Sequence, residues 1–185
     1  MRMNYYGPKD LAGSFRTVRK NTLTIAEEIP EEKYAFRAVE STQTVGELLT
    51  HIALGGRFQE QVVLIDQRTS MVGFDFMSFT NALRAELSQP RTKAQIIQLL
   101  KDEGDRYARA VESLSEDFVA QNIMMPPGGS PPSRTRFDLL LSVKEHEMHH
   151  RGQLMLMERM LGITPHLTRE HQARLAAMQA RINSA

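Results

Sequence analysis

The stretch of sequence that decides the fold is TRFDLLLSVKEHEMHHRGQLMLMERMLG, residues 135–162. Its apolar residues recur three and four positions apart, which is the spacing of one face of an α-helix. Thr135 followed by Asp138 can cap the start of this helix, and Gly162 favours its end near Leu161. The spacing predicts one inward stripe of mixed character: Leu139, Val143, His146, His150, Gln153 and Met157.

Other segments of the chain have the same helical periodicity, and strand signals are nearly absent. Two of these segments begin at candidate capping boxes, Thr44 with Glu47 and Thr92 with Gln95. Segments 71–91 and 124–134 look irregular, apart from a short helix near 79–87. We therefore expect an all-α four-helix bundle as one domain over residues 1–185, with a core at about 8–162 and an additional C-terminal helix at about 168–182. The four core helices are expected at about 8–30, 44–68, 92–114 and 135–161.

Composition narrows the class of protein. The 185 residues include no cysteine, so disulfides, thiolate metal sites and cysteine-dependent catalysis are excluded. With 23 basic and 22 acidic residues, the chain lacks the positive field that nucleic-acid binding needs. No apolar run approaches the roughly 20 residues that span a bilayer, and residues 1–10 lack the apolar core of a signal peptide. We expect a cytoplasmic protein without nucleic-acid or membrane partners.

Three of the six histidines lie where a bundle core would ordinarily hold leucine. His146 and His150 are four residues apart on one helix, so their rings can bind the same ion. His51 has an equivalent inward place on the second helix, between Leu48 and Gly55. A divalent metal ion satisfies one nitrogen of each neutral ring. Three protein ligands leave a coordination position open, as in catalytic rather than structural sites.

Residues beside the three histidines are candidates for supporting roles. Gln153 lies on the inward stripe and can position a metal-bound molecule. His149 should point about 100° away from its neighbours, as a supporting or surface residue. Glu147 is expected to form an exposed or interhelical ion pair of small energetic value with Arg151. No catalytic base stands out from the sequence.

Two readings compete with an open metal site. Residues 146–150, HEMHH, also fit the HExxH pattern of zinc proteases, in which Glu147 would be the general base. Gln153 occupies the glycine position of the longer protease motif, so this reading is not favoured. The other interpretation is a metal-free helical dimer in which the histidines only fill the core.

The strings KEHEMHHRGQL, residues 144–154, and TVGELLTHI, residues 44–52, together resemble the DinB/YfiT-like family. The resemblance covers roughly residues 8–161 in helix order and motif position. It implies a four-helix bundle whose metal ion is held by three histidines, matching His51, His146 and His150. It further implies zinc or nickel as the ion, and a homodimer.

Relatives with known activity include bacillithiol-dependent transferases and mycothiol-dependent maleylpyruvate isomerases, in which the metal is thought to activate the thiol. The leading hypothesis is therefore a metal-dependent transferase that acts on a small molecule with a low-molecular-weight thiol cosubstrate. The alternatives are a non-enzymatic, metal-dependent binding or stress-response protein and a metal-dependent hydrolase.

Overall fold

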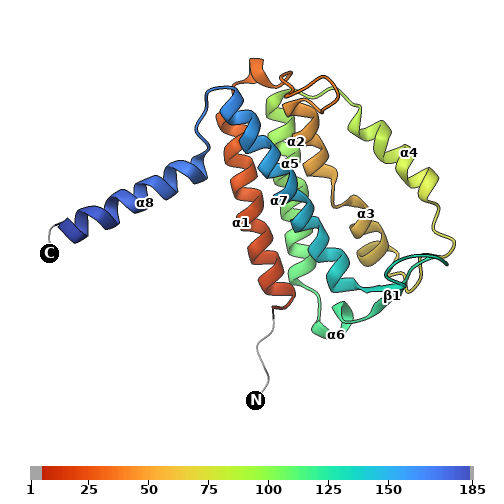
Figure 1. Cartoon of the computed structure of the whole chain (residues 1–185). Coiled ribbons are helices and arrows are strands. Elements are labelled where there is room, and N and C mark those ends of the chain that lie inside the picture. Colours follow the sequence, from red (N-terminus) through yellow and green to blue (C-terminus); the bar gives the residue numbers. More distant parts are fainter. Residues whose placement is uncertain (1–5, 184–185) are drawn as a thin grey trace.

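The computed structural model describes residues 6–183, so residues 1–5 of the N-terminal stretch considered above lie outside it. Four long helical segments pack side by side, and a further helix projects from one end of them (Figure 1). The prediction of an all-α four-helix bundle with an additional C-terminal helix is confirmed. The bundle consists of α1 (Pro8–Glu28), α2 (Val45–Leu54) with its continuation, α5 (Lys93–Glu112) and α7 (Arg136–Met160), and the projecting helix is α8 (His166–Asn183).

The helix starts read from the sequence are also confirmed. The Thr44 hydroxyl accepts a hydrogen bond from the Glu47 amide at 3.2 Å, and the Glu47 carboxylate accepts one from the Thr44 amide at 2.7 Å. An equivalent box starts α5. At α7 the Thr135 hydroxyl accepts a hydrogen bond from the Asp138 amide at 3.0 Å. These bonds satisfy backbone donors that have no partner within the helix.

The second helical segment differs from the expected continuous helix. It stops at Leu54, and after Gly55 and Gly56 it resumes as α3 (Arg57–Gln59) and the π-helix η2 (Glu60–Ile65). Two adjacent glycines weaken an α-helix, and the wider π turn rotates the residues that follow it. Ile65, three residues after the buried Val62, is 68% exposed at the end of the π-helix.

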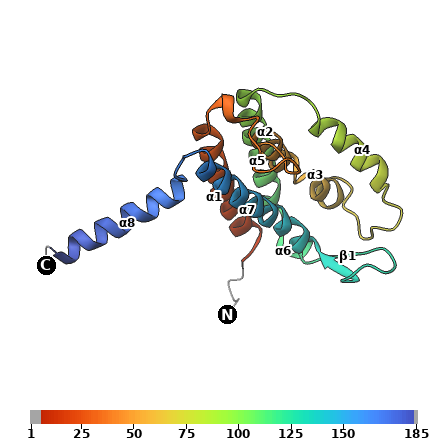
Figure 2. The same cartoon turned by 45° about the horizontal axis from the view of Figure 1, so that its top comes forward.

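The segments expected to be irregular contain short elements. Helix α4 (Phe76–Leu87) includes the predicted short helix and flanks the bundle beside α2 and α3 (Figure 2). Strands β1 (Asn122–Met124) and β2 (Ser133–Thr135) form an antiparallel hairpin that the sequence did not predict, because its strands are too short to show an alternation. The remaining elements are the 3-10 helix η1 (Glu31–Lys33) and α6 (Glu116–Val119).

Two apolar clusters fill the bundle. One includes Phe15 and Val143, and the other includes Ile25 and Leu154. The apolar stripe of α1 is buried throughout, as its spacing predicts. Within residues 6–183, no helix is long and apolar enough to cross a membrane.

Glu158 of α7 lies at the foot of α8 and is fully buried. Among the described residues, neither of its carboxylate oxygens has a hydrogen-bond partner. Burial, followed by the charge of Glu28, raises the pKa of Glu158 to about 7. Between its ordinary value of 4.5 and about pH 7, the folded chain keeps a proton that the unfolded chain has lost. The resulting contribution to stability is complete below pH 4.5 and is lost as the pH rises through about 7.

We expect Glu158→Gln, which carries no charge at any pH, to stabilise the protein more at high pH than at low pH. Relative to wild type, the gain should be larger at about pH 8 than at about pH 5 by on the order of 2 kcal/mol. Thermal unfolding across this range measures the difference, and Glu170→Gln on the exposed part of α8 is the matched control. If the difference in stability between wild type and Glu158→Gln does not change with pH, the raised pKa of Glu158 is contradicted.

Candidate metal centre

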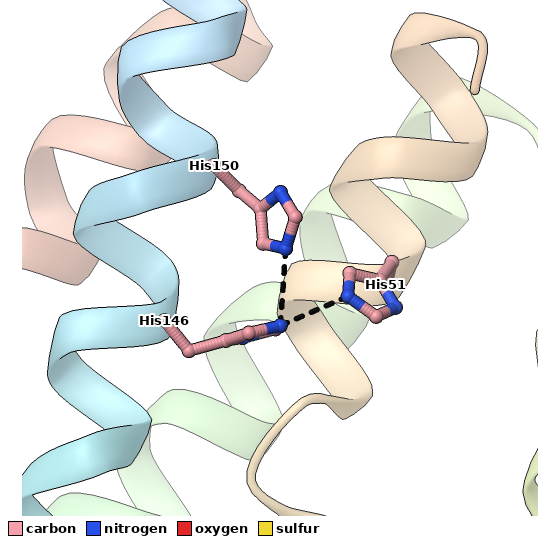
Figure 3. A group of neighbouring side chains, drawn as sticks. All are labelled: His51, His146 and His150. Atoms are coloured by element: carbon pink, nitrogen blue, oxygen red, sulfur yellow. Dashed lines mark hydrogen bonds between the residues drawn. The ribbon is translucent and has the colours of Figure 1, made fainter. Parts of the chain in front are cut away.

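Three histidines from two helices converge on one point (Figure 3). His51 comes from α2, and His146 and His150 come from successive turns of α7. The Nε2 atom of His146 lies 2.9 Å from Nε2 of His51 and 3.0 Å from Nε2 of His150. In the part of the chain that the structure describes, these three form the one group of histidine, aspartate and glutamate side chains able to hold a metal ion.

The convergence depends on close contact between α2 and α7 at Gly55. A Cβ atom at Gly55 would lie 2.7 Å from Cε1 and 2.8 Å from Nδ1 of His146. Such a distance forces the imidazole to move, so a residue without a side chain is required here. Gly55 lies one turn after His51 on the same helical face. This spacing is the sequence feature that could have indicated a close approach of α7 at Gly55.

Burial favours the neutral, metal-binding form of the imidazoles. It lowers the pKa of His146 to about 4, with a further contribution from the neighbouring histidines. It also lowers the pKa of His51, and His150 adds to this effect. Near neutral pH both rings therefore keep a free lone pair for a metal ion.

Gln153 orients one of the three rings. The Nδ1 atom of His150 lies 2.7 Å from the Gln153 amide oxygen, the geometry of an Nδ1–H donor. With Nδ1 bound in this way, Nε2 of His150 is directed at the other two rings. A hydrogen bond to the outer nitrogen is the usual support for a histidine that binds a metal. The amide nitrogen of Gln153 in turn lies 3.4 Å from Nε2 of His149.

Gln153 nevertheless differs from its predicted position, because it is exposed rather than part of an inner stripe. The most deeply buried positions at this level of α7 are Glu147 and Leu154, and His146 and His150 are only half-buried. The triad thus lies on the flank of the bundle, between α2 and α7, and not on its axis. His149 is exposed, as its helical phase predicts.

The expectation for Glu147 is wrong in both burial and partner. Its side chain is 1% exposed and binds Arg19 of α1, with both carboxylate oxygens 3.0 Å from the arginine Nε. Arg19 also donates to the Leu100 carbonyl of α5 at 2.6 Å and approaches the Ile52 carbonyl of α2 at 3.5 Å. The side chain of Arg19 therefore contacts all the other helical segments of the bundle. Sequence reasoning missed it, although an arginine four residues after Phe15 on an apolar stripe was a signal.

The donor set fits a divalent transition metal. Imidazole nitrogens suit zinc, nickel and similar ions. Two nitrogens bound to a tetrahedral zinc ion are about 3.4 Å apart, a few tenths of an ångström more than the separations here. The triad could therefore hold one ion, with no fourth protein ligand among the described residues.

Helix α4, from the segment expected to be irregular, lines a cavity that lies away from the triad. A cavity of about 460 Å³ lies between α4, the π-helix and α5, with Phe79 and Leu83 of α4 in its wall. None of the three histidines lines it. The open side of the triad is instead bordered by the exposed residues His149 and Gln153.

Comparisons with known proteins agree with this architecture. The chain is 23% identical over 154 residues to the uncharacterized protein YjoA of Bacillus subtilis, covering 83% of this chain and 90% of YjoA. The crystal structure of YjoA, a DinB-like protein, superposes with a TM-score of 0.62 over 83% of this chain and 93% of that one. YfiT of Bacillus subtilis, described as a probable metal-dependent hydrolase with an unusual four-helix bundle topology, superposes with a TM-score of 0.65. The two sequences are 13% identical, and the superposition covers 88% of this chain and 91% of YfiT.

The decisive match is to the family itself. The sequence pattern of the DinB superfamily matches residues 14–154, which contain the whole triad and most of the bundle and end before α8. That range is well over half of the chain, and the helices it spans are those that position His51, His146 and His150. The protein therefore belongs to the DinB superfamily.

Proposed function

We propose that this protein is a metal-dependent enzyme that holds one zinc or nickel ion through Nε2 of His51, His146 and His150. The observation that carries the proposal is the convergence of three half-buried imidazoles on one point, with no fourth protein ligand among residues 6–183. A bound divalent ion lowers the pKa of a coordinated thiol or water and so supplies a nucleophile near neutral pH. The open side of the triad admits a small molecule.

The surroundings of the triad favour a thiol as the nucleophile. Metal-bound water in HExxH enzymes needs a neighbouring carboxylate as general base. Here the corresponding residue, Glu147, is held in a buried ion pair with Arg19 and faces the bundle core. A low-molecular-weight thiol ionises more readily than water, so it needs no such base. We infer that the reaction is transfer of a small thiol to an electrophilic substrate.

A metal-dependent hydrolase is the second candidate, favoured by the similarity to YfiT, described as a probable metal-dependent hydrolase. In this chain the side chain best placed to accept a proton at the open side is His149, which hydrogen-bonds with Gln153. A hydrolase of this kind would use His149, and not Glu147, to take up the proton.

The two candidates are separated by assaying the zinc- and nickel-loaded protein, free of any histidine tag. Thiol transfer is measured with chlorodinitrobenzene and a panel of low-molecular-weight thiols, and hydrolysis is measured with nitrophenyl esters. We expect metal-dependent thiol transfer that is lost in His146→Ala and retained in Gln98→Ala, a change on the exposed face of α5. Hydrolysis that depends on His149 would favour the second candidate. Stable metal binding without turnover in either assay would indicate a non-enzymatic binding protein.

A further inference from the structure

Helix α4 lies alongside the bundle with a cavity beneath it (Figures 1 and 2). Every residue of this helix is exposed or half-buried. Near its start, the rings of Phe76 and Phe79 pack on Phe58 with centroids 5.6 and 5.8 Å apart. Near its end, Glu86 pairs with Arg57 at 3.4 Å. The cavity of about 460 Å³ between α4 and the bundle has the size of a pocket for a small molecule.

One part of the cavity lining is apolar. It comes from Phe79, Ala82 and Leu83 of α4, with Leu64 of the π-helix and Ala110 of α5. The π-helix contributes four of its six residues to the lining, and π turns are frequent at functional sites. A ligand with an apolar body therefore has a surface to pack on.

The other part of the lining is charged, and it holds more carboxylates than guanidinium groups. Arg57 pairs with Glu103 at 2.8 Å and with Glu86 at 3.4 Å. Arg106 pairs with Glu60 at 2.7 Å and also with Glu103. Three carboxylates thus share two guanidinium groups, which leaves one negative charge in this network without a counter-charge. A concave site with such an excess attracts a cation and repels an anion.

Glu60 is the carboxylate best placed to bind that cation. It lines the cavity, yet only 7% of the residue is exposed. Its Oε2 accepts a hydrogen bond from Arg106, whereas its Oε1 has no hydrogen-bond partner among the described residues. Burial raises the pKa of Glu60 even though the charge of Arg106 lowers it. Arg106 alone therefore does not compensate for the burial of this carboxylate, and a second positive group would stabilise its charged form.

We propose that this cavity binds a small amphipathic amine, with its ammonium group on Glu60 and its apolar body between α4 and the π-helix. The ammonium group supplies the missing positive charge. It can also donate to Oε1 of Glu60 and to Oε2 of Glu86, the two oxygens of the network that neither arginine binds. The apolar body fills the space that separates α4 from the bundle. None of the three histidines lines the cavity, so binding of the amine does not require the metal ion.

The first test is isothermal titration calorimetry of the full chain, free of any histidine tag, with benzylamine, phenethylamine and 4-phenylbutylamine. The anion 4-phenylbutyrate and the neutral 4-phenylbutanol test the choice of head group. We expect at least one amine to bind about tenfold or more tightly than either of these two. If the anion binds as tightly as the amines, or no amine binds at millimolar concentration, the proposal is wrong.

Amines can also coordinate a metal ion, so each titration is repeated with metal-free protein, zinc-loaded protein and His146→Ala. The affinity for the amine should be the same in all three. This result separates the amine site from the metal-dependent function, since the second can fail while the first holds. Binding that requires zinc and is lost in His146→Ala would place the amine at the triad and overturn the proposal.

Two variants locate the bound amine. Glu60→Gln removes the charge but keeps an acceptor for Arg106, and it should weaken amine binding by about tenfold or more. Its control is Glu112→Gln, which removes the charge of an exposed glutamate outside the cavity. Ala82→Leu fills the cavity and should abolish binding with no change in helix content, whereas Ala85→Leu makes the same change on α4 outside the lining. Unchanged binding in Glu60→Gln or in Ala82→Leu, or equal weakening by the matched control, would refute the proposal.

Discussion

His146→Ala is expected to reduce bound metal from about one ion per wild-type chain to less than about a tenth of that value. In the proposed site His146 is the central ligand, since its Nε2 lies within 3.0 Å of Nε2 of both other histidines. Its removal leaves two imidazoles on different helices, an arrangement too weak to retain an ion through dialysis. Elemental analysis of tag-free protein measures the change. His51→Ala should show the same loss, although residue 51 is 95 positions away in the sequence.

The control for this experiment is His171→Ala, which removes an exposed histidine of α8 and should leave the metal content unchanged. Gly55→Ala gives an intermediate case. It keeps all three ligands but displaces the His146 ring, so metal should bind with about ten- to a hundredfold lower affinity. If wild type takes up no metal from zinc or nickel solutions near neutral pH, the histidines are polar core residues and the proposed function is wrong.

Arg19→Met is expected to destabilise the fold by about 3–5 kcal/mol. The substitution keeps most of the side-chain volume but leaves the Glu147 carboxylate, 1% exposed, without its counter-charge. The same change removes a hydrogen bond to the Leu100 carbonyl. Thermal or denaturant unfolding measures the loss, which for a chain of this size corresponds to a fall in melting temperature of about 10 °C.

Two further variants make this prediction specific. Arg16→Met removes the half-exposed ion pair with Glu112 one turn earlier on α1 and should leave the melting temperature nearly unchanged. Arg19→Met/Glu147→Leu removes both buried charges and should recover most of the stability. An Arg19→Met variant no less stable than Arg16→Met would contradict the account. A stable double variant that binds metal but has lost activity would restore Glu147 as a catalytic base.

Local signals predicted most of the fold. The capping residues of α2, α5 and α7 and the apolar stripe of α1 each depend on residues within one or two turns, so the sequence contains the whole pattern. The end of α2 was less predictable. Gly55 and Gly56 weaken the helix, but the sequence does not show that both also lie against α7, where a Cβ atom would approach His146 and Val143 closely.

The candidate site was also predicted in part, where its pattern lies within one or two helical turns. The spacing of His146 and His150 is local, and His51 shares their helical phase. The partner of Glu147 is 128 residues away on α1, and no local pattern distinguishes it from the nearby Arg151. The exposure of Gln153 depends on how far α2 covers α7, which is a property of the packed bundle. The sequence therefore could not predict the long-range pair of Arg19 with Glu147, nor which residues at the edge of α7 are covered by α2.

The position of the triad on the flank of the bundle has an evolutionary consequence. The three half-buried histidines belong to neither apolar cluster, so they can be replaced without opening a void in either one. Selection for folding and selection for the proposed metal site would therefore act on largely separate residues. A descendant of this protein can lose or exchange its ligands, acquire a new chemistry or become a simple binding protein, and still inherit a stable scaffold.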